Sequence, residues 1–229
     1  MCNKSHEIVS NMDYLRGLLW MKGEGLEGGL GRQIYESSQN FARNAWKGVC
    51  EKIDAGSTQL QWDQRLVDIM NASFAKVSWD DFQSSFRDQP YTIIHGDFHP
   101  ANIMIHKDSK EVYIIDWEMV GVGRAAQDLG QFVISHLAPE DRRQVESLAL
   151  DEYYDSLVKA AEGKIDVNTY TKEVCRQEYV AGGVARWVWL LAYIAHSCPE
   201  NFTKFFHDQL LAFILDHNVT PESVDMPRV

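Results

Sequence analysis

Three oxygen-bearing side chains in one short stretch of this chain have the types and the spacing that phosphoryl transfer requires. Asp97 and Asn102 lie in the segment HGDFHPAN at residues 95–102, and Asp116 lies in the segment IIDW at residues 114–117. A carboxylate can hold the attacking hydroxyl and take its proton, while oxygen ligands can hold Mg²⁺ on the phosphates of a nucleotide. The pattern predicts that Asp97 holds the hydroxyl and that Asn102 and Asp116 bind the metal ion.

Short strands must position these residues, and the sequence predicts three of them. β-rich runs occupy residues 91–94, 103–106 and 111–115. Pro100 indicates a loop before Asn102, and the polar run 107–110 indicates a tight turn. If the second and third strands pair as a hairpin, Asn102 and Asp116 come together, because each lies at the corresponding end of one strand.

The motifs resemble those of a known group of enzymes. HGDFHPAN, IIDWE and the segment GVGRAAQDLG at residues 121–130 are similar to motifs of the aminoglycoside phosphotransferase and choline-kinase-like superfamily, in particular its choline-kinase-like (CHK-like) and ecdysteroid-kinase-like groups. The strong motifs cover residues 91–130. Protein kinases carry His-Arg-Asp and Asp-Phe-Gly at these places, whereas this chain has Gly96 and Trp117, which favours a small-molecule kinase.

The resemblance implies roles for further residues and a fold. Asp97 would be the catalytic base, His95 would brace the catalytic loop, and His99 would support the same loop. Asp128 would match a later Asp of the family that fastens this loop through backbone hydrogen bonds. A simpler interpretation of Asp128 is an acid at the start of a helix. We expect the buried role, because a buried carboxylate persists only when it is hydrogen bonded.

The implied fold is α+β and mainly helical, namely the C-terminal lobe of the protein-kinase-like fold with a short catalytic β-hairpin. The implied activity is ATP- and Mg²⁺-dependent transfer of the γ-phosphate to a hydroxyl of a small molecule, which could be choline-like, aminoglycoside-like or another alcohol. The alternative is a non-catalytic pseudokinase or truncated kinase lobe that binds a ligand without turnover.

A kinase also needs a nucleotide-binding lobe, and we expect this N-terminal lobe to be missing from the chain. Residues 1–90 have the pattern of helices, without a strand Lys of the kinase type. The segment Gly23–Gly28 matches GxGxxG, but no alternating strand pattern flanks it. We interpret it as a flexible glycine-rich loop and expect the chain alone to bind ATP weakly.

The chain is expected to form a single kinase-like lobe over residues 1–229. Its predicted parts are a helical lead-in (1–90), the catalytic loop and metal-binding hairpin (91–135), a helical substrate-side subdomain (136–218) and a loosely packed tail (219–229). Helices are predicted over 127–136, from Pro139 to about Ala161, over 168–196 with softening at Gly182–Gly183, and from Glu200 onward. A further helix is predicted to begin at the capping residue Ser78.

Two helical faces are predicted in the lead-in. Ile34, Phe41, Ala45, Val49 and Ile53 fall on one face of a first helix. Trp62, Leu66, Met70 and Phe74 repeat the same periodicity in a second helix.

Aromatic residues of the long helix 168–196 are candidates for the acceptor site. In choline-kinase-like enzymes a helix in this region carries aromatic residues that line that site. Trp189 and Tyr193 share a helical face, whereas Trp187 points about 200° away from Trp189. With Glu118 and Asp97 nearby, this face would suit an amine or quaternary ammonium alcohol through cation–π contacts. The alternatives are a neutral acceptor on an apolar surface, or aromatic residues that belong to the core.

A metal hydrolase is the rival chemical interpretation. His95, Asp97 and His99 place metal-binding side chains on alternate residues. A binuclear hydrolase requires further clusters, whereas the remaining histidines of the helical part are isolated and are expected in the core or on the surface: His136, His196, His207 and His217.

Composition limits the partners. The net charge of −11 over 229 residues makes a nucleic-acid partner unexpected, and 45% hydrophobic residues suit a globular core. Cys2, Cys50, Cys175 and Cys198 lack disulfide or metal spacing, which favours a reducing compartment. No apolar run has the length of a signal core or a membrane span. We therefore expect a cytoplasmic protein.

Overall fold

The computed structural model describes residues 29–85, 92–124 and 126–228, so the segment Gly23–Gly28 lies outside the described residues. The described part is mainly helical, as predicted. Its α-helices are α3 (Gly29–Asp54), α4 (Gln64–Ala75), α5 (Trp79–Ser84), α6 (Gln127–His136), α7 (Pro139–Ala160), α8 (Lys172–Ser197) and α9 (Glu200–Asp216). Its strands are β1 (Thr92–Ile94), β2 (Ile103–Ile105), β3 (Val112–Ile114) and β4 (Gly121–Gly123). None of the described helices combines the length and the apolar character that a membrane crossing requires.

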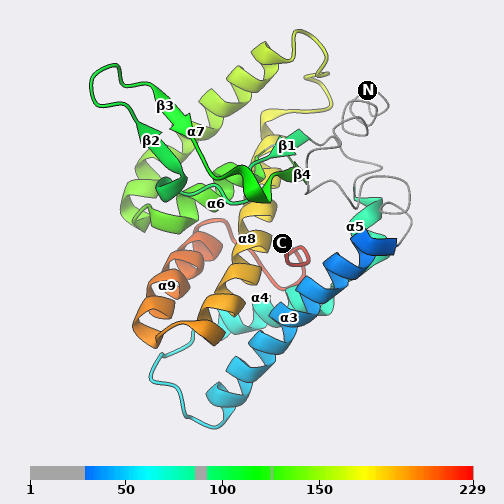
Figure 1. Cartoon of the computed structure of the whole chain (residues 1–229), viewed down its shortest axis with the longest axis vertical. Helices are drawn as coiled ribbons and strands as arrows, with labels where there is room; N and C mark the ends of the chain where they lie inside the picture. Colours follow the sequence, from blue (N-terminus) through cyan, green and yellow to red (C-terminus); the bar gives the residue numbers. More distant parts are fainter. Residues whose placement is uncertain (1–28, 86–91, 125, 229) are drawn as a thin grey trace.

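Helix α8 forms the centre of the molecule, and α3, α6 and α9 pack around it (Figure 1). Tyr179, Val188 and Leu191 of α8 are fully buried in the hydrophobic core. Helix α4 contributes Leu66 and Met70 to the same core, which confirms the face predicted there. The core is therefore built around the helix in which the acceptor aromatics were predicted.

Helix α8 continues through Gly182 and Gly183, where the sequence predicted a weak point. A Cβ atom on Gly130 of α6 would lie 2.5 Å from the backbone oxygen of Tyr179, and one on Gly183 would lie 3.0 Å from the Cα of Gly130. The two helix backbones thus cross in near contact. Glycine inside a helix costs about 1 kcal/mol relative to alanine. In return, the absence of a side chain allows the two helices to cross this closely. The crossing fixes α6 against α8.

The strands form two separate antiparallel pairs, β1 with β4 and β2 with β3. The predicted hairpin is confirmed, with Ile103 opposite Ile114, and it projects away from the helices (Figure 1). Its side chains Met104 and Tyr113 are exposed. The pairing of β1 with β4 was not predicted, because β4 is a three-residue glycine-containing strand without a hydrophobic pattern.

Two sequence-based expectations need correction. The face predicted in α3 is wrong for Ile34 and Phe41, which are exposed, whereas Ala45 and Val49 of the same predicted face are buried. Tyr35, Ala42 and Trp46, which were not predicted there, also face the core. This 26-residue helix carries apolar residues on more than one stripe, so periodicity alone did not show which of them pack.

The tail is also packed rather than loose. Val224 is buried, and Nζ of Lys76 donates to the backbone oxygens of Pro221, Glu222 and Val224. The backbone N–H of Arg228 donates to the Ala185 oxygen at 3.0 Å. Hydrogen bonds to main-chain oxygens hold the tail, and hydropathy does not reveal them.

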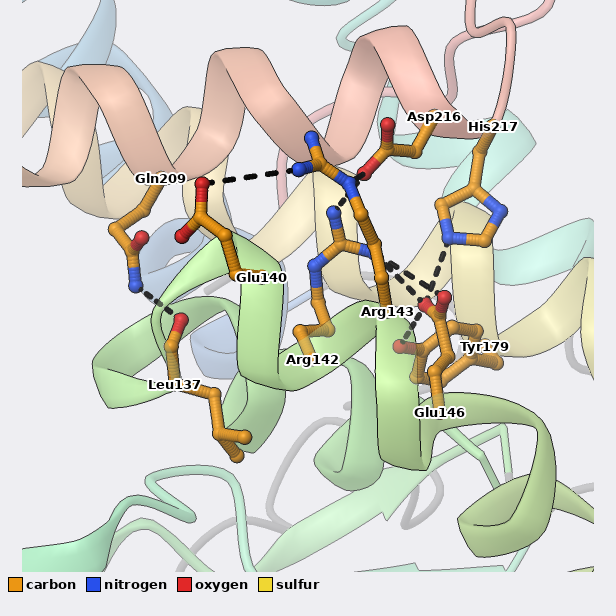
Figure 2. A network of polar contacts seen from close by, with 9 residues as sticks. All are labelled: Leu137, Glu140, Arg142, Arg143, Glu146, Tyr179, Gln209, Asp216 and His217. Carbon is orange, nitrogen blue, oxygen red and sulfur yellow. Dashed lines mark hydrogen bonds and ion pairs between the residues drawn. The ribbon is translucent and has the colours of Figure 1, made fainter.

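A polar network joins α7 to α9 (Figure 2). Arg142 is almost fully buried and forms ion pairs with Glu146 and Asp216. Glu146 also accepts hydrogen bonds from Tyr179 Oη at 2.6 Å and contacts His217 Nε2 at 2.8 Å. The buried Arg142 guanidinium is thus paired with carboxylates, and buried charges are stable only when they are paired in this way.

Candidate active site

The loop that carries Asp97 is fastened to the first turn of α6. Oδ2 of Asp128 accepts the backbone N–H of His95 at 2.6 Å, and its Oδ1 accepts that of Gly96 at 3.2 Å. Burial raises the pKa of the Asp128 carboxyl, although both hydrogen bonds and the charge of Arg186 oppose the rise. These are the backbone contacts expected of Asp128.

Gly96 has a conformation and a close neighbour that only glycine accepts. Its φ is +79°, in the left-handed region, and a Cβ atom would lie 2.2 Å from the backbone oxygen of Met119. The loop therefore lies directly against the segment that follows Asp116.

His95 links the two halves of the candidate site. It is 3% exposed, and its Nδ1 accepts the backbone N–H of Asp97 at 3.3 Å. Its Nε2 lies 2.9 Å from the backbone oxygen of Ile115 and therefore donates to it, since a carbonyl can only accept. Because both ring nitrogens are used by the backbone, His95 is not free to bind a metal ion, which weighs against the hydrolase interpretation.

Three side chains surround the Asp97 carboxylate. Gln131 Nε2 of α6 donates to its Oδ1 at 3.2 Å, and Arg186 Nη2 of α8 lies 3.9 Å from the same oxygen. His99 Nε2 lies 3.4 Å from Oδ2. Gln131 and Arg186 were not predicted as site residues from the sequence. Gln131 could have been found because it lies three positions after Asp128 on the same helical face. Arg186 could have been found because it is a charged residue beside the apolar run WVWLLA.

Asn102 connects the loop to the hairpin. It ends a short 3-10 turn, Pro100–Asn102, and is largely buried. Its Nδ2 donates to the Asp97 backbone oxygen at 2.9 Å, and its own backbone oxygen accepts the N–H of Ile115 at 3.0 Å. Two hydrogen bonds thus link Asp97, Asn102 and the residue that precedes Asp116.

Asp116 is an exposed residue in the left-handed conformation, with φ 64° and ψ 56°. Its carboxylate makes no capping hydrogen bond to the turn Trp117–Met119, in which Glu118 is also exposed. Aspartate tolerates the left-handed region better than most residues, and residues held in it cluster at active sites.

The oxygen atoms of Asn102 and Asp116 suit a hard cation. The bond from Asn102 Nδ2 to the Asp97 carbonyl leaves the amide oxygen of Asn102 for another partner. Amide and carboxylate oxygens are the ligand types that Mg²⁺ takes beside phosphate and water. In the described part of the chain, no group of three or more His, Cys, Asp or Glu side chains could hold a metal ion.

The aromatic residues of α8 divide between two environments. Trp187 stacks on Phe206 with ring centres 4.9 Å apart, inside the core. Trp189 and Tyr193 stack on each other at 6.0 Å, and Phe41 of α3 lies against both rings. The opposite directions of Trp187 and Trp189 agree with the helical-wheel expectation.

The Trp189 ring already has a positively charged neighbour. The Arg186 guanidinium carbon lies 5.7 Å from the ring centre. The contacts among Trp189, Tyr193 and Phe41 are those of packed aromatics. Among the described residues, no hydrogen bond or ion pair joins the exposed Glu118 to this face.

Comparison with known proteins gives one family. Residues 83–199 match the family DUF1679, which is described as "Uncharacterized oxidoreductase dhs-27". No curated protein and no solved structure matches the chain. The matched segment begins before β1 and extends to the end of α8, so it contains every predicted site residue. Because the match covers just over half of the sequence, the chain belongs to the DUF1679 family.

Proposed function

We propose that this chain carries the catalytic site of an ATP- and Mg²⁺-dependent phosphotransferase that acts on a hydroxyl of a small molecule. The observation that carries the proposal is the hydrogen-bonded link from Asp97 through Asn102 to Ile115, next to Asp116. The likeness of the motifs to the aminoglycoside phosphotransferase and choline-kinase-like superfamily supports it. The motif residues that this chemistry needs are thereby tied into one small region.

Asp97 would act as the base. Its carboxylate takes the proton of the acceptor hydroxyl as the hydroxyl oxygen forms a bond to the γ-phosphorus of ATP, while the bond from that phosphorus to the ADP oxygen breaks. The side chain is about one-third exposed, which leaves it accessible to an acceptor. Mg²⁺, held by Asn102 and Asp116, would neutralise negative charge on the phosphates.

The description of the family suggests oxidoreduction, which the described architecture supports less well. Dinucleotide-binding domains are built on a parallel sheet with helices on both faces. The strands in the described ranges instead form two antiparallel pairs. The hydrogen-bonded loop that presents Asp97 suits a proton acceptor in phosphoryl transfer.

The acceptor is expected to carry no positive charge where it meets α8. The Arg186 guanidinium lies beside both Asp97 and the Trp189 ring, so a second cation would be repelled. This modifies the expectation of an ammonium acceptor that the aromatic residues suggested from sequence. Sugars and other uncharged alcohols are therefore preferred over choline or ethanolamine.

The test is an assay of ADP release and phosphate transfer by the full chain at millimolar Mg-ATP, because weak nucleotide binding is expected. Choline, ethanolamine, an aminoglycoside, a sugar and a hydroxylated lipid serve as acceptors. Asp97→Asn should reduce kcat by roughly 10²- to 10⁴-fold. Asp108→Asn, an exposed carboxylate in the hairpin turn, is the matched control and should leave kcat unchanged.

Two results would contradict the proposal. Equal activity of Asp97→Asn and the unaltered protein would remove Asp97 from the reaction. Binding of Mg-ATP without transfer to any acceptor would instead support the non-catalytic alternative.

A further inference from the structure

Arg186 of α8 is buried directly beside the proposed base. Only 3% of the residue is exposed, and its Nη2 lies 3.9 Å from Oδ1 of Asp97. Its guanidinium carbon also lies 5.7 Å from the centre of the Trp189 ring. Burial lowers the pKa of the Arg186 guanidinium, and the charges of Asp97 and Asp128 oppose this change. Arg186 is therefore a buried cation whose ion-pair partner belongs to the candidate site.

The pairing of Arg186 is incomplete. A guanidinium has five N–H donors in a fixed planar arrangement. Nε and Nη1 of Arg186 are buried and have no hydrogen-bond partner among the described residues. The separation of Nη2 from Asp97 also exceeds the length of a hydrogen bond. Buried unpaired donors and a partly paired charge lower stability, so a purely structural role does not explain this residue.

We propose that Arg186 is a positioning residue for Asp97, an inference that rests on the proposed phosphotransferase function. Arg186 and Gln131 approach the same oxygen, Oδ1, from two helices. The near contact of Gly130 with Gly183 fixes these helices relative to each other. Because both helices direct a donor at Oδ1, the second oxygen, Oδ2, which the loop residue His99 approaches at 3.4 Å, would take the hydroxyl proton.

His99 restrains the second oxygen from the loop itself. Its Nδ1 accepts the backbone N–H of Ala101 at 3.3 Å. Neutral His99 therefore carries its proton on Nε2, which faces Oδ2 of Asp97 at 3.4 Å. Arg186 differs from His99 because it comes from α8. It couples the direction of the base to the helix that also carries Trp189 and Tyr193.

Arg186→Met tests this role in the full chain. Methionine matches the aliphatic stem of arginine, lacks charge and N–H groups, and can keep a contact with the Trp189 ring. We expect kcat to fall roughly 10- to 100-fold, because a small displacement of a catalytic group slows transfer strongly. KM for Mg-ATP should stay within about twofold. The thermal midpoint should stay equal or rise, because unpaired buried donors are removed.

Three further variants complete the experiment. Arg186→Lys retains the charge and should recover part of kcat. Gln131→Met removes the other donor to Oδ1 and should also lower kcat. Arg176→Met is the matched control, since Arg176 lies on the same helix but lines a separate cavity with the tail residue Val224. It should leave kcat unchanged.

The outcomes separate this inference from the function on which it rests. If Arg186→Met keeps the wild-type kcat, the inference is overturned and the proposed function stands. The same holds if kcat falls only because the thermal midpoint falls. If the Arg186 variants do not fold, Gln131→Met decides, and an unchanged kcat there overturns it. A wild-type chain that transfers no phosphate to any acceptor overturns the proposed function and the inference together.

Discussion

The backbone N–H of His95 donates to Oδ2 of Asp128 at 2.6 Å, although 33 positions separate the two residues in the chain. Asp128 belongs to the first turn of α6, and the same helix carries Gln131, which contacts Asp97. The carboxylate of Asp128 therefore fixes the start of the loop, and Gln131 fixes the side chain that the loop presents. Both restraints depend on the position of one helix.

Asp128→Asn should destabilise the protein and lower activity. An amide keeps one acceptor oxygen but turns an NH₂ donor toward the other backbone N–H, from His95 or Gly96. A buried donor left unpaired costs about 1–3 kcal/mol, and we expect a loss of this size in the free energy of unfolding, measured by urea denaturation. Asp141→Asn is the control, because Asp141 is an exposed acid in the first turn of α7. It should lose only about 0.3–1 kcal/mol, and equal losses in the two variants would reduce Asp128 to a helix-dipole residue.

Gly96→Ala should be much more damaging than Gly163→Ala. Both glycines have a φ of +79°, but an added Cβ meets the Met119 backbone oxygen at 2.2 Å in Gly96 and nothing within 4 Å in Gly163. Gly163→Ala should therefore show only the left-handed backbone penalty, about 1–2 kcal/mol. Gly96→Ala adds a clash with backbone and should lose about 1–3 kcal/mol more, together with most phosphate transfer. Thermal and urea unfolding of the two variants provide the comparison, and similar losses would show that the loop can move away from Met119.

Sequence patterns predicted the parts of the fold that depend on local chemistry. The start of α7 at Pro139 and the side-chain cap from Ser78 to the N–H of Asp81 are both confirmed. The hairpin is confirmed because the polar turn and the two β-rich runs leave few other pairings. Asp97, Asn102 and Asp116 could be singled out because residue type and spacing are written in the sequence.

Tertiary contacts set the features that the sequence did not predict. Gln131 and Arg186 reach Asp97 only because α6 and α8 cross at two glycines. The inward face of α3 depends on which of several apolar stripes meets α8, so Phe41 was placed wrongly. The tail residue Val224 is held by Lys76 through backbone oxygens, which any sequence provides.

The network of Figure 2 should make stability depend on acid pH. Burial acts to raise the pKa of Glu146, but hydrogen bonds from His217 and Tyr179 and the charges of His217 and Arg142 outweigh it and lower the pKa from 4.5 to about 2. A lowered pKa in the folded state means that the carboxylate stabilises the fold above pH 4.5. This contribution, on the order of 3 kcal/mol by linkage, is lost as the pH falls from 4.5 toward 2.

Glu146→Gln isolates this contribution. The difference in unfolding free energy between the unaltered protein and Glu146→Gln, from urea titrations, should be largest between pH 5 and 7 and should shrink at pH 3. Glu152→Gln, an exposed acid on the same helix, should show a small difference at every pH. A difference for Glu146→Gln that stayed constant down to pH 3 would mean that its ionisation does not support the fold.

Asp116→Asn should separate metal binding from folding. Asparagine tolerates the left-handed conformation of Asp116 as well as aspartate does, so the thermal midpoint should be unchanged. The amide lacks the negative charge that favours Mg²⁺ over water. We expect the Mg²⁺ concentration for half-maximal phosphate transfer to rise by about tenfold or more, and Mn²⁺ binding in the presence of ATP, followed by electron paramagnetic resonance, to weaken in parallel. Asp97→Asn should instead lower kcat without this change in metal requirement. An unchanged metal requirement in Asp116→Asn would assign the exposed carboxylate and its left-handed backbone to another role.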